Sequence, residues 1–543
     1  MQTLLGLILA MSITVVLMPL LMRWAVPLGI IDMPAARKVH AVPIPRVGGL
    51  AMGGGVLAAM LPWSLATRPL QALTLGIGVL LCFGVWDDRR SLGAAPKFAG
   101  QAIAALIVMF WGGVIIGVLT PSDRVPLPEW IALPLTGLFL LGGTNAFNLA
   151  DGLDGLAGGM SILCFCGTAL LAFTVGDVAV GSVAVIFVGA VIGFLRFNTH
   201  PARVFMGDGG SQVLGFSAAV LAIVLTQDPH APLSTALPLL LMGMPIIDTL
   251  TVMTERLLAH RSPFKADRRH IHHRLLALGL EHWEAVSALY LLQGLLFVAA
   301  WYLRFASDLN VLLVFALFSA LVVVPLRLAE HWQLQVRRVP QAGHGSNSAM
   351  PGRGSATWSG SLARGVIGVA LSCYALWILA FSVPASADIR LFALLLAVVL
   401  LVSTAWRWRQ AEVSWVEKAA LYSAAALAVY LGRHVNGNAV PALLVEYALF
   451  PLLAVAVLMN FRSAAGRPFR LTPLDILVLL VVLTVPNLPN SIASASVTGV
   501  TVVELVVLFY SLEVISLTSI RGTRCLRAGA VILLLGLAAR SWL

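Results

Sequence analysis

Residues 180–197 read VGSVAVIFVGAVIGFLRF, and Arg196 is the only charged side chain among them. As a helix, such a run is long enough to cross the roughly 30 Å of hydrocarbon in a bilayer. Similar runs recur throughout the 543 residues, of which 59% are hydrophobic and 11% are charged. Soluble domains carry roughly a quarter charged residues. The sequence therefore predicts an all-α protein, a polytopic transmembrane helical bundle.

The apolar runs predict two blocks of membrane spans with a linker between them. Residues 1–330 are expected to hold about eleven spans, near 2–22, 47–66, 70–86, 98–119, 131–147, 156–174, 180–197, 211–226, 234–254, 283–302 and 309–328. Residues 331–363 are rich in Arg, Gly and Ser and are expected to form a flexible cytoplasmic linker. Residues 364–543 are expected to add about seven spans, near 365–383, 389–405, 418–432, 440–460, 473–486, 499–519 and 527–539.

Basic residues gather in alternate loops. One set of loops contains Arg37 and Lys38, Arg89 and Arg90, and the segment 256–274, while the other set is short and nearly neutral. Because Lys and Arg accumulate on the cytoplasmic side of membrane proteins, we expect the first set to be cytoplasmic and the amino terminus to lie outside. The net charge of +11 is spread over these loops, so no nucleic-acid partner is expected.

A pair of acids follows the third predicted span in the motif WDDRRSLGAAPKFAGQ at 86–101. Asp87 and Asp88 repel each other, and a divalent cation or the nearby Lys97 would relieve that repulsion. A solvated acid pair beside the two following arginines is an equally open interpretation.

A second polar motif, NAFNLADGLDGLAGG at 145–159, spaces its polar residues three apart: Asn145, Asn148, Asp151 and Asp154. Neighbours at this spacing share a helix face, and the glycines are expected to bend the segment. Amide and carboxylate oxygens suit Mg²⁺ or the edge of a base and ribose. The alternative is a capped turn between two helices.

The third motif, FNTHPARVFMGDGGSQVLG at 197–215, places Asp208 in a glycine-rich turn before a span. Glycines let backbone N–H groups approach an anion, and the carboxylate can hold a metal. A lone glycine-rich turn is weak support by itself. Its expected position on the same side of the membrane as the other acids strengthens the interpretation.

Two basic loops complete the pattern. The loop at 255–280 contains six potential anion ligands: His270, His272, His273, Arg268, Arg269 and Arg274. A pyrophosphate fits this array, and zinc is the less favoured alternative because arginines repel a cation. The proline-rich loop at 31–49 contains Lys38, for which lipid head-group contact and binding of an anionic substrate are both open. Acidic metal ligands, a basic anion site and an apolar surround together suit phosphoryl transfer with a lipid substrate.

In this order the motifs resemble the polyprenyl-phosphate N-acetylhexosamine-1-phosphate transferases of glycosyltransferase family 4, which include undecaprenyl-phosphate GlcNAc-1-phosphate transferases. The likeness covers about residues 30–280. It implies transfer of a sugar 1-phosphate from a UDP-N-acetyl sugar, by default UDP-GlcNAc, to undecaprenyl phosphate with release of UMP. It also implies a bacterial inner-membrane location among membrane lipids and Mg²⁺ as the cofactor, with Mn²⁺ as a substitute, and it leaves a homodimer open.

The resemblance assigns a role to each matched position. It makes Asp208, with Asn148, the metal ligands, and Asp87 the base that deprotonates the lipid phosphate, supported by Asp88. Lys97, His270, His272 and His273 would neutralise phosphate charge. The implied substrate contacts are Asn145, Asn148, Asp151, Asp154, Arg268, Arg269 and Lys38.

The sequence His-Ile-His-His-Arg at 270–274 resembles the branch of the family that initiates O-antigen, teichoic-acid or exopolysaccharide lipids. A transporter of lipid-linked or nucleotide sugars is the alternative function, which requires acids near the bilayer midplane. The acids of 1–330 instead fall at span ends. Residues 364–543 match no motif of this family, and their acids Glu446, Asp475, Glu504 and Glu513 fit either a polar path or ordinary interhelical hydrogen bonds.

Overall fold

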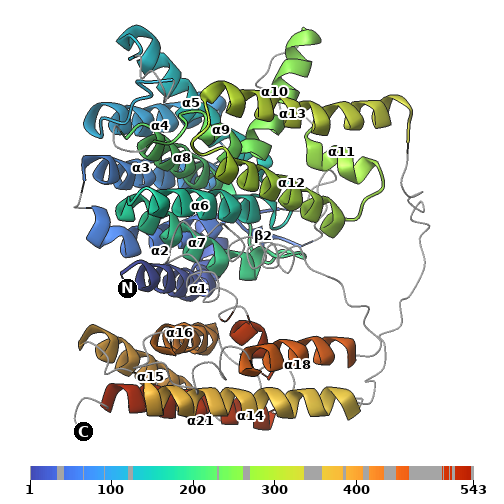
Figure 1. Ribbon diagram of the computed structural model, residues 1–543. Coiled ribbons are helices and arrows are strands. Elements are labelled where there is room, and N and C mark those ends of the chain that lie inside the picture. The colour runs from blue at the N-terminus through green and yellow to red at the C-terminus, as the bar shows by residue number, and fades with distance from the viewer. Residues whose placement is uncertain are drawn as a thin grey trace. The chain divides into compact units, whose positions relative to one another are not determined.

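Figure 1 shows the computed structural model of the chain. It describes residues 2–33, 42–64, 67–90, 92–119, 126–228, 232–260, 269–334, 358–382, 387–407, 415–432, 448–463, 504, 507–512, 514–515 and 520–539. The chain divides into two compact units, the first made of Met1–Ala342 and Leu471–Val481 and the second of Gly343–Arg470 and Val482–Leu543.

The first unit is a bundle of helices, as the apolar runs predict. Its helices are α1 (Gln2–Leu28), α2 (Gly48–Ser64), α3 (Arg68–Arg90), α4 (Ala94–Leu106), α5 (Glu129–Ala150), α6 (Leu156–Thr174), α7 (Val178–Asn198), α8 (Gly207–Thr226), α9 (Leu237–Leu241), α10 (Gly243–Leu258), α11 (Ile271–Ala277), α12 (His282–Tyr302) and α13 (Asp308–His331). Across the described part of the whole chain, ten helices are long and apolar enough to cross a membrane.

Three local features depart from a bundle of unbroken α-helices. The predicted span at 234–254 is two helices, α9 and α10, which meet at Met242. The predicted span at 98–119 ends earlier, because α4 runs into the π-helix η1 (Ile107–Trp111) and the chain then leaves the helix. A two-residue antiparallel ladder joins β1 (Ile31–Asp32) to β2 (Ile44–Pro45), a small addition to an otherwise all-helical fold.

Helix α8 is the centre of the bundle and is almost entirely buried. It contacts α2, α3, α5, α6, α7 and α9, and Figure 1 shows it among near-parallel neighbours. In lipid no hydrophobic force drives one helix against another, so small residues that let backbones approach closely provide the packing energy. The sequence of α8 contains four glycines, which meet this need.

Glycine contacts set the spacing of α8 from its neighbours. A Cβ on Gly84 of α3 would lie 2.1 Å from the Cα of Gly209, and a Cβ on Gly49 of α2 would lie 2.4 Å from the Cα of Gly210. These distances are shorter than any contact a Cβ makes in a folded protein. The helices α2 and α3 therefore approach α8 backbone to backbone.

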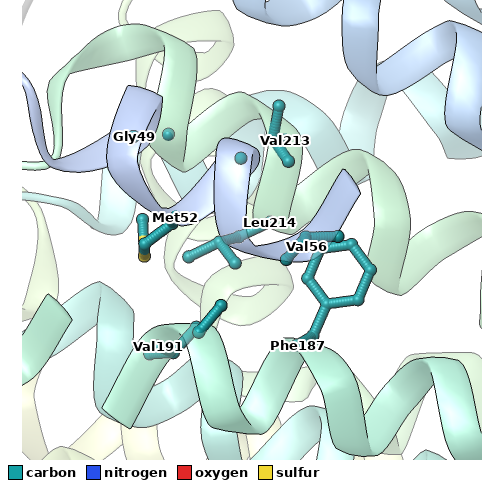
Figure 2. A pocket seen from close by; sticks show the side chains of 10 residues that line it. Gly49, Met52, Val56, Phe187, Val191, Val213 and Leu214 are labelled. Atoms are coloured by element: carbon teal, nitrogen blue, oxygen red, sulfur yellow. The ribbon is translucent and has the colours of Figure 1, made fainter. Parts of the chain in front are cut away.

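Figure 2 shows a small apolar pocket where α2, α7 and α8 meet. Its lining consists of Gly49, Met52, Gly53, Val56, Phe187, Ala190, Val191, Gly210, Val213 and Leu214. None of these side chains ionises or makes a strong hydrogen bond. The pocket is therefore a packing feature of the bundle rather than a place for acid–base or metal chemistry.

The second unit contains α14 (Trp358–Phe381), α15 (Ala387–Arg407), α16 (Trp415–Gly432), α18 (Phe450–Ser463) and α21 (Ile520–Ala539). Its core includes a fully buried ion pair, with Arg527 Nη2 on α21 lying 2.9 Å from Glu417 Oε2 on α16. Ser403 Oγ donates to the other oxygen of Glu417 at 3.0 Å. Of the four acids that the sequence singled out in residues 364–543, the described residues include only Glu504, which is buried.

Adding a methyl group where α3 meets α8 is expected to destabilise the first unit. Gly84→Ala places a Cβ against Gly209, and overpacking of this kind costs about 1–3 kcal/mol. Gly78→Ala is the matched control on the same helix, because a Cβ there meets nothing within 4 Å. Thermal unfolding of the two variants in detergent measures the difference. Equal melting temperatures would contradict the close approach of α3 and α8.

Candidate active site

Three polar side chains from three helices meet at one end of the bundle. Asp87 lies in the last turn of α3, Lys97 in the first turn of α4 and Asp208 in the first turn of α8. Lys97 Nζ lies 2.7 Å from Asp87 Oδ2 and 2.5 Å from Asp208 Oδ2. The sequence predicted these residues separately, 111 positions apart for Lys97 and Asp208, and the structure brings them together.

Asp88 contacts the same cluster through the backbone of Asp208. Its Oδ1 accepts a hydrogen bond of 3.2 Å from the backbone N–H of Asp208, and its side chain is buried. Gly207 adopts a φ of +73°, and a Cβ there would lie 2.5 Å from Asp88 Oδ2. Only glycine therefore fits before Asp208, for conformational and steric reasons together. This gives the glycine-rich turn a specific purpose, which is to admit the Asp88 carboxylate.

The asparagine–aspartate segment is divided between a helix and a turn. Asn145 and Asn148 lie on α5, which ends at Ala150, and the chain then turns through Asp151 to Gly155, whose φ is +83°. The four polar residues therefore do not share one helix face, in agreement with the bend expected from the glycines.

Both asparagines already have hydrogen-bond partners on neighbouring helices. Asn145 Nδ2 donates to Gln101 Oε1 at 2.8 Å, linking α5 to α4. Asn148 Oδ1 accepts from Ser211 Oγ at 2.7 Å, one turn after Asp208 on α8. Gln101 and Ser211 belong to the quoted motifs, but the sequence offered no reason to single them out. Their role follows only from the packing of α4 and α8 against α5.

Asp151 lies in an excess of negative charge. Burial, with the negative charges of Asp208, Asp154 and Asp88, raises the pKa of Asp151 to about 7, against the opposing effect of Arg46. The carboxyl therefore retains a proton up to neutral pH, far above the ordinary aspartate range. A site with this much negative charge favours an added cation.

Asp154 makes its contacts outside the group formed by Asp87, Lys97 and Asp208, which we call the acid–lysine cluster. Its Oδ2 accepts from the backbone N–H of Ala202 at 3.0 Å and lies 2.7 Å from His200 Nδ1. The imidazole of His282, the first residue of α12, stacks on that of His200 with ring centres 4.1 Å apart. Neither histidine was among the predicted site residues, and only the meeting of three loops reveals them.

The histidine loop is held by an acid that the sequence did not single out. Asp248 on α10 is buried, and its two oxygens lie 2.9 Å from His270 Nδ1 and 2.7 Å from the backbone N of Ile271. This contact fixes the orientation of the His270 ring. An available signal was the position of Asp248 inside the apolar run PIIDTL at 245–250, where an unpaired carboxylate is costly.

His272 is not a cation at neutral pH. It packs against the turn after α5, where a Cβ on Gly152 would lie 2.2 Å from His272 Nε2. Burial, the largest effect, lowers its pKa to about 3. Its Nε2 is buried and has no hydrogen-bond partner among the described residues. His272 therefore offers a neutral hydrogen-bonding group beside Asp151, rather than the positive charge that the sequence suggested.

The arginines of this loop divide into different roles. Arg274 is a structural anchor rather than a free anion ligand, because its guanidinium contacts Glu255 Oε1 at 2.5 Å and Glu330 Oε2 at 3.3 Å. Arg269 begins the described part of the loop, and its backbone oxygen accepts from Arg274 Nε. Arg268 and Lys38 lie outside the described residues. The loop histidines do not converge as metal ligands in the described part of the chain.

The acid–lysine cluster has the donor set for a hard divalent cation. Asp88 and Asp208 provide carboxylate oxygens and Asn148 an amide oxygen, all close to the start of α8. Mg²⁺ prefers oxygen ligands of this kind and few of them, because it keeps several of its waters. The raised pKa of Asp151 indicates that the surrounding negative charge also favours a cation. The residues present therefore fit Mg²⁺.

These residues lie in a region of the chain that is similar to known proteins. The profile of Glycosyl transferase family 4 matches residues 70–226, which include Asp87, Lys97, Asp151 and Asp208. A probable undecaprenyl-phosphate N-acetylglucosaminyl 1-phosphate transferase of Bacillus subtilis is 35% identical over 322 residues, covering 58% of this chain and 89% of the relative.

More distant relatives have similar names. A decaprenyl-phosphate N-acetylglucosaminephosphotransferase of Mycolicibacterium smegmatis is 34% identical over 307 residues, covering 50% of this chain and 75% of the relative. An undecaprenyl-phosphate alpha-N-acetylglucosaminyl 1-phosphate transferase of Escherichia coli K12 is 28% identical over 299 residues, covering 53% and 81%. The resemblance read from the four motifs is thus confirmed, and the chain belongs to glycosyl transferase family 4.

Proposed function

We propose that the chain transfers N-acetylglucosamine 1-phosphate from UDP-GlcNAc to a polyprenyl phosphate and so initiates a lipid-linked glycan. The observation that supports this most directly is the cluster of Asp87, Lys97 and Asp208 in a chain whose relatives are named for this activity. A basic residue between two acids can bind phosphate oxygens on one side while the acids hold a proton or a metal on the other.

The proposed reaction is a displacement at phosphorus. An oxygen of the lipid phosphate forms a bond to the β-phosphorus of UDP-GlcNAc. The bond from that phosphorus to the bridging oxygen breaks, and UMP departs with the electron pair. The products are UMP and a polyprenyl diphosphate carrying the sugar.

Asp87 is the proposed base for the lipid phosphate. A phosphate monoester loses its second proton near a pH of about 6. At neutral pH most of the lipid phosphate has therefore already lost the proton that the base would remove. Leu92 N–H donates to Asp87 Oδ1 at 2.5 Å, and Lys97 pairs with Oδ2. These two contacts hold the carboxylate at the end of α3. Asp88 then orients Asp208 through the backbone N–H of Asp208.

Asp208 and Asn148 are the proposed ligands of Mg²⁺, which when bound would neutralise charge on the diphosphate. Lys97 would exchange its contact with Asp208 for phosphate oxygens. The Nδ1 of His270 contacts Asp248, so its Nε2 would be the atom that binds substrate. His272 and His273 add hydrogen-bonding groups beside it. The further proposed substrate contacts are Asn145, Asp151, Asp154, Arg268, Arg269 and Lys38.

The chain is a multi-pass membrane protein of a bacterial family. We further propose that about eleven spans lie in residues 1–330 and about seven in 364–543, with the amino terminus outside and the site in the cytoplasm. The contacts of Asp208 with α3 and α4, and of Asp154 with His200, support one common side for these loops. Acids gathered at one end of the bundle do not form the midplane path that a transporter needs.

Removing the principal proposed metal ligand is expected to abolish turnover. Purified protein with Mg²⁺, UDP-GlcNAc and undecaprenyl phosphate should release UMP. Asp208→Asn should lower the rate by about 100-fold or more, because an electrostatic contact in a dry site contributes on this scale. Asp177→Asn is the control, since Asp177 caps α7 and should affect stability alone. No UMP release from any UDP-N-acetyl sugar would exclude the proposed function.

The second unit is expected to be dispensable for the chemical step. All the described site residues lie within Met1–Ala342, so a chain ending at residue 344 should retain UMP release within a few-fold of the full chain. The measurement is the rate per mole of protein that remains monodisperse in detergent. Loss of turnover in a well-folded truncated chain would assign part of the site to the second unit.

Asp151 is expected to titrate near neutral pH. Because its pKa is raised to about 7, the carboxyl is protonated below that pH and ionised above it. The infrared difference spectrum between the wild type and Asp151→Asn should contain a carboxylic-acid band that disappears as the pH rises through about 7. Asp154→Asn removes one negative charge, so it should move this midpoint to lower pH. A midpoint in the ordinary aspartate range would contradict the charge excess.

A further inference from the structure

A second group of potential metal ligands lies beside the acid–lysine cluster. Asp154 comes from the turn between α5 and α6, His200 from the loop between α7 and α8, and His282 from the start of α12. One ligand atom of each lies within 4.8 Å of the others. We propose that Asp154, His200 and His282 bind a divalent transition-type cation such as Zn²⁺, at a site distinct from that of Asp208.

The geometry requires only small shifts of the side chains to coordinate a metal. His200 Nδ1 lies 2.7 Å from Asp154 Oδ2, and His282 Nε2 lies 3.1 Å from the backbone oxygen of Asp154. Zinc bonds to nitrogen and carboxylate oxygen measure about 2.0–2.2 Å, which places tetrahedral ligands roughly 3.3 Å apart. The His200–Asp154 pair therefore has to open by roughly 0.6 Å, and a pair at the 4.8 Å limit has to close by roughly 1.5 Å.

The donor types select the class of metal. Two imidazole nitrogens and one carboxylate oxygen are a common ligand set for Zn²⁺ and leave a fourth position for water. Mg²⁺ instead requires oxygen ligands in octahedral geometry, which suits the Asp208 cluster. The chain thus offers two sites of different chemistry within one end of the bundle.

The ligands are accessible, and their loops are held by other bonds. The side chains of His200 and Asp154 are 46% and 19% exposed, so a cation can enter from solvent. Asn198 Oδ1 accepts from the Gly155 N–H at 2.8 Å, and Tyr290 OH donates to the Gly155 oxygen at 2.7 Å. These buried bonds join the same three segments without using the ligand atoms, so metal can exchange while the loops stay in place.

The ligand carboxylate also has an outer partner. The backbone N–H of Ala202 donates to Asp154 Oδ2 at 3.0 Å and fixes the orientation of the carboxylate. Contacts of this kind around a metal typically change its affinity by about 10–100-fold. Their presence distinguishes an organised site from three side chains that are merely close. The metal would join segments that lie more than 40 positions apart in the sequence.

The test is Zn²⁺ binding by the full chain in detergent after treatment with a chelator. Titration against a chromogenic chelator should show one Zn²⁺ per chain that depends on the cluster. His200→Ala and His282→Ala should each weaken this binding by at least tenfold. The matched control is His331→Ala, an exposed histidine at the end of α13, which should bind as the wild type does. Equal affinity in the wild type and both cluster variants would overturn the proposal, as would no binding by the wild type.

A spectroscopic measurement guards against misfolded variants. Co²⁺ in the wild type should give the visible bands of four- or five-coordinate metal, and Asp208→Asn should retain them because it leaves this cluster intact. A purely octahedral spectrum in the wild type would also overturn the proposal. Melting temperatures without metal verify the folding of each variant. Zn²⁺ should raise the melting temperature of the wild type but not those of His200→Ala and His282→Ala, because binding to the folded state stabilises it.

Discussion

The close approach of α3 to α8 is the contact on which the rest of the site depends. Gly84 and Gly209 let the two backbones touch, and this places the last turn of α3 beside the first turn of α8. The carboxylates of Asp87 and Asp208 can then share Lys97. A larger residue at either glycine would separate the two carboxylates by the width of a side chain. Packing energy between helices thus determines the electrostatics of the site.

The cluster formed in this way contains more acidic than basic side chains. Lys97 pairs with Asp87 and Asp208, and Asp88 contacts the backbone of Asp208. Burial, together with the negative charges around it, raises the pKa of Asp151 nearby to about 7. Such an arrangement is costly at a membrane edge unless a ligand offsets it. A divalent cation and the diphosphate that accompanies it would provide that compensation, which explains why oxygen ligands and basic groups occur together here.

Both units bury charge in ion pairs. In the first, Arg274 pairs with Glu255 of α10, and both side chains are buried. In the second, Glu417 and Arg527 are both fully buried and pair with each other. A buried pair contributes little net stability, whereas breaking it costs several kcal/mol. The pair therefore specifies how α16 and α21 pack.

The sequence by itself determined the membrane class, the long helices among the described residues of 1–330 and the family, because apolar run length and ordered polar motifs are local properties. It also predicted Asp87, Lys97 and Asp208 as site residues. Only the tertiary structure decided which of them touch, and it alone revealed Asp248, His200 and His282. These partners come from loops far apart in the chain, and no local pattern encodes that meeting. The lowered pKa of His272 has the same origin, since burial in the folded chain is its largest cause.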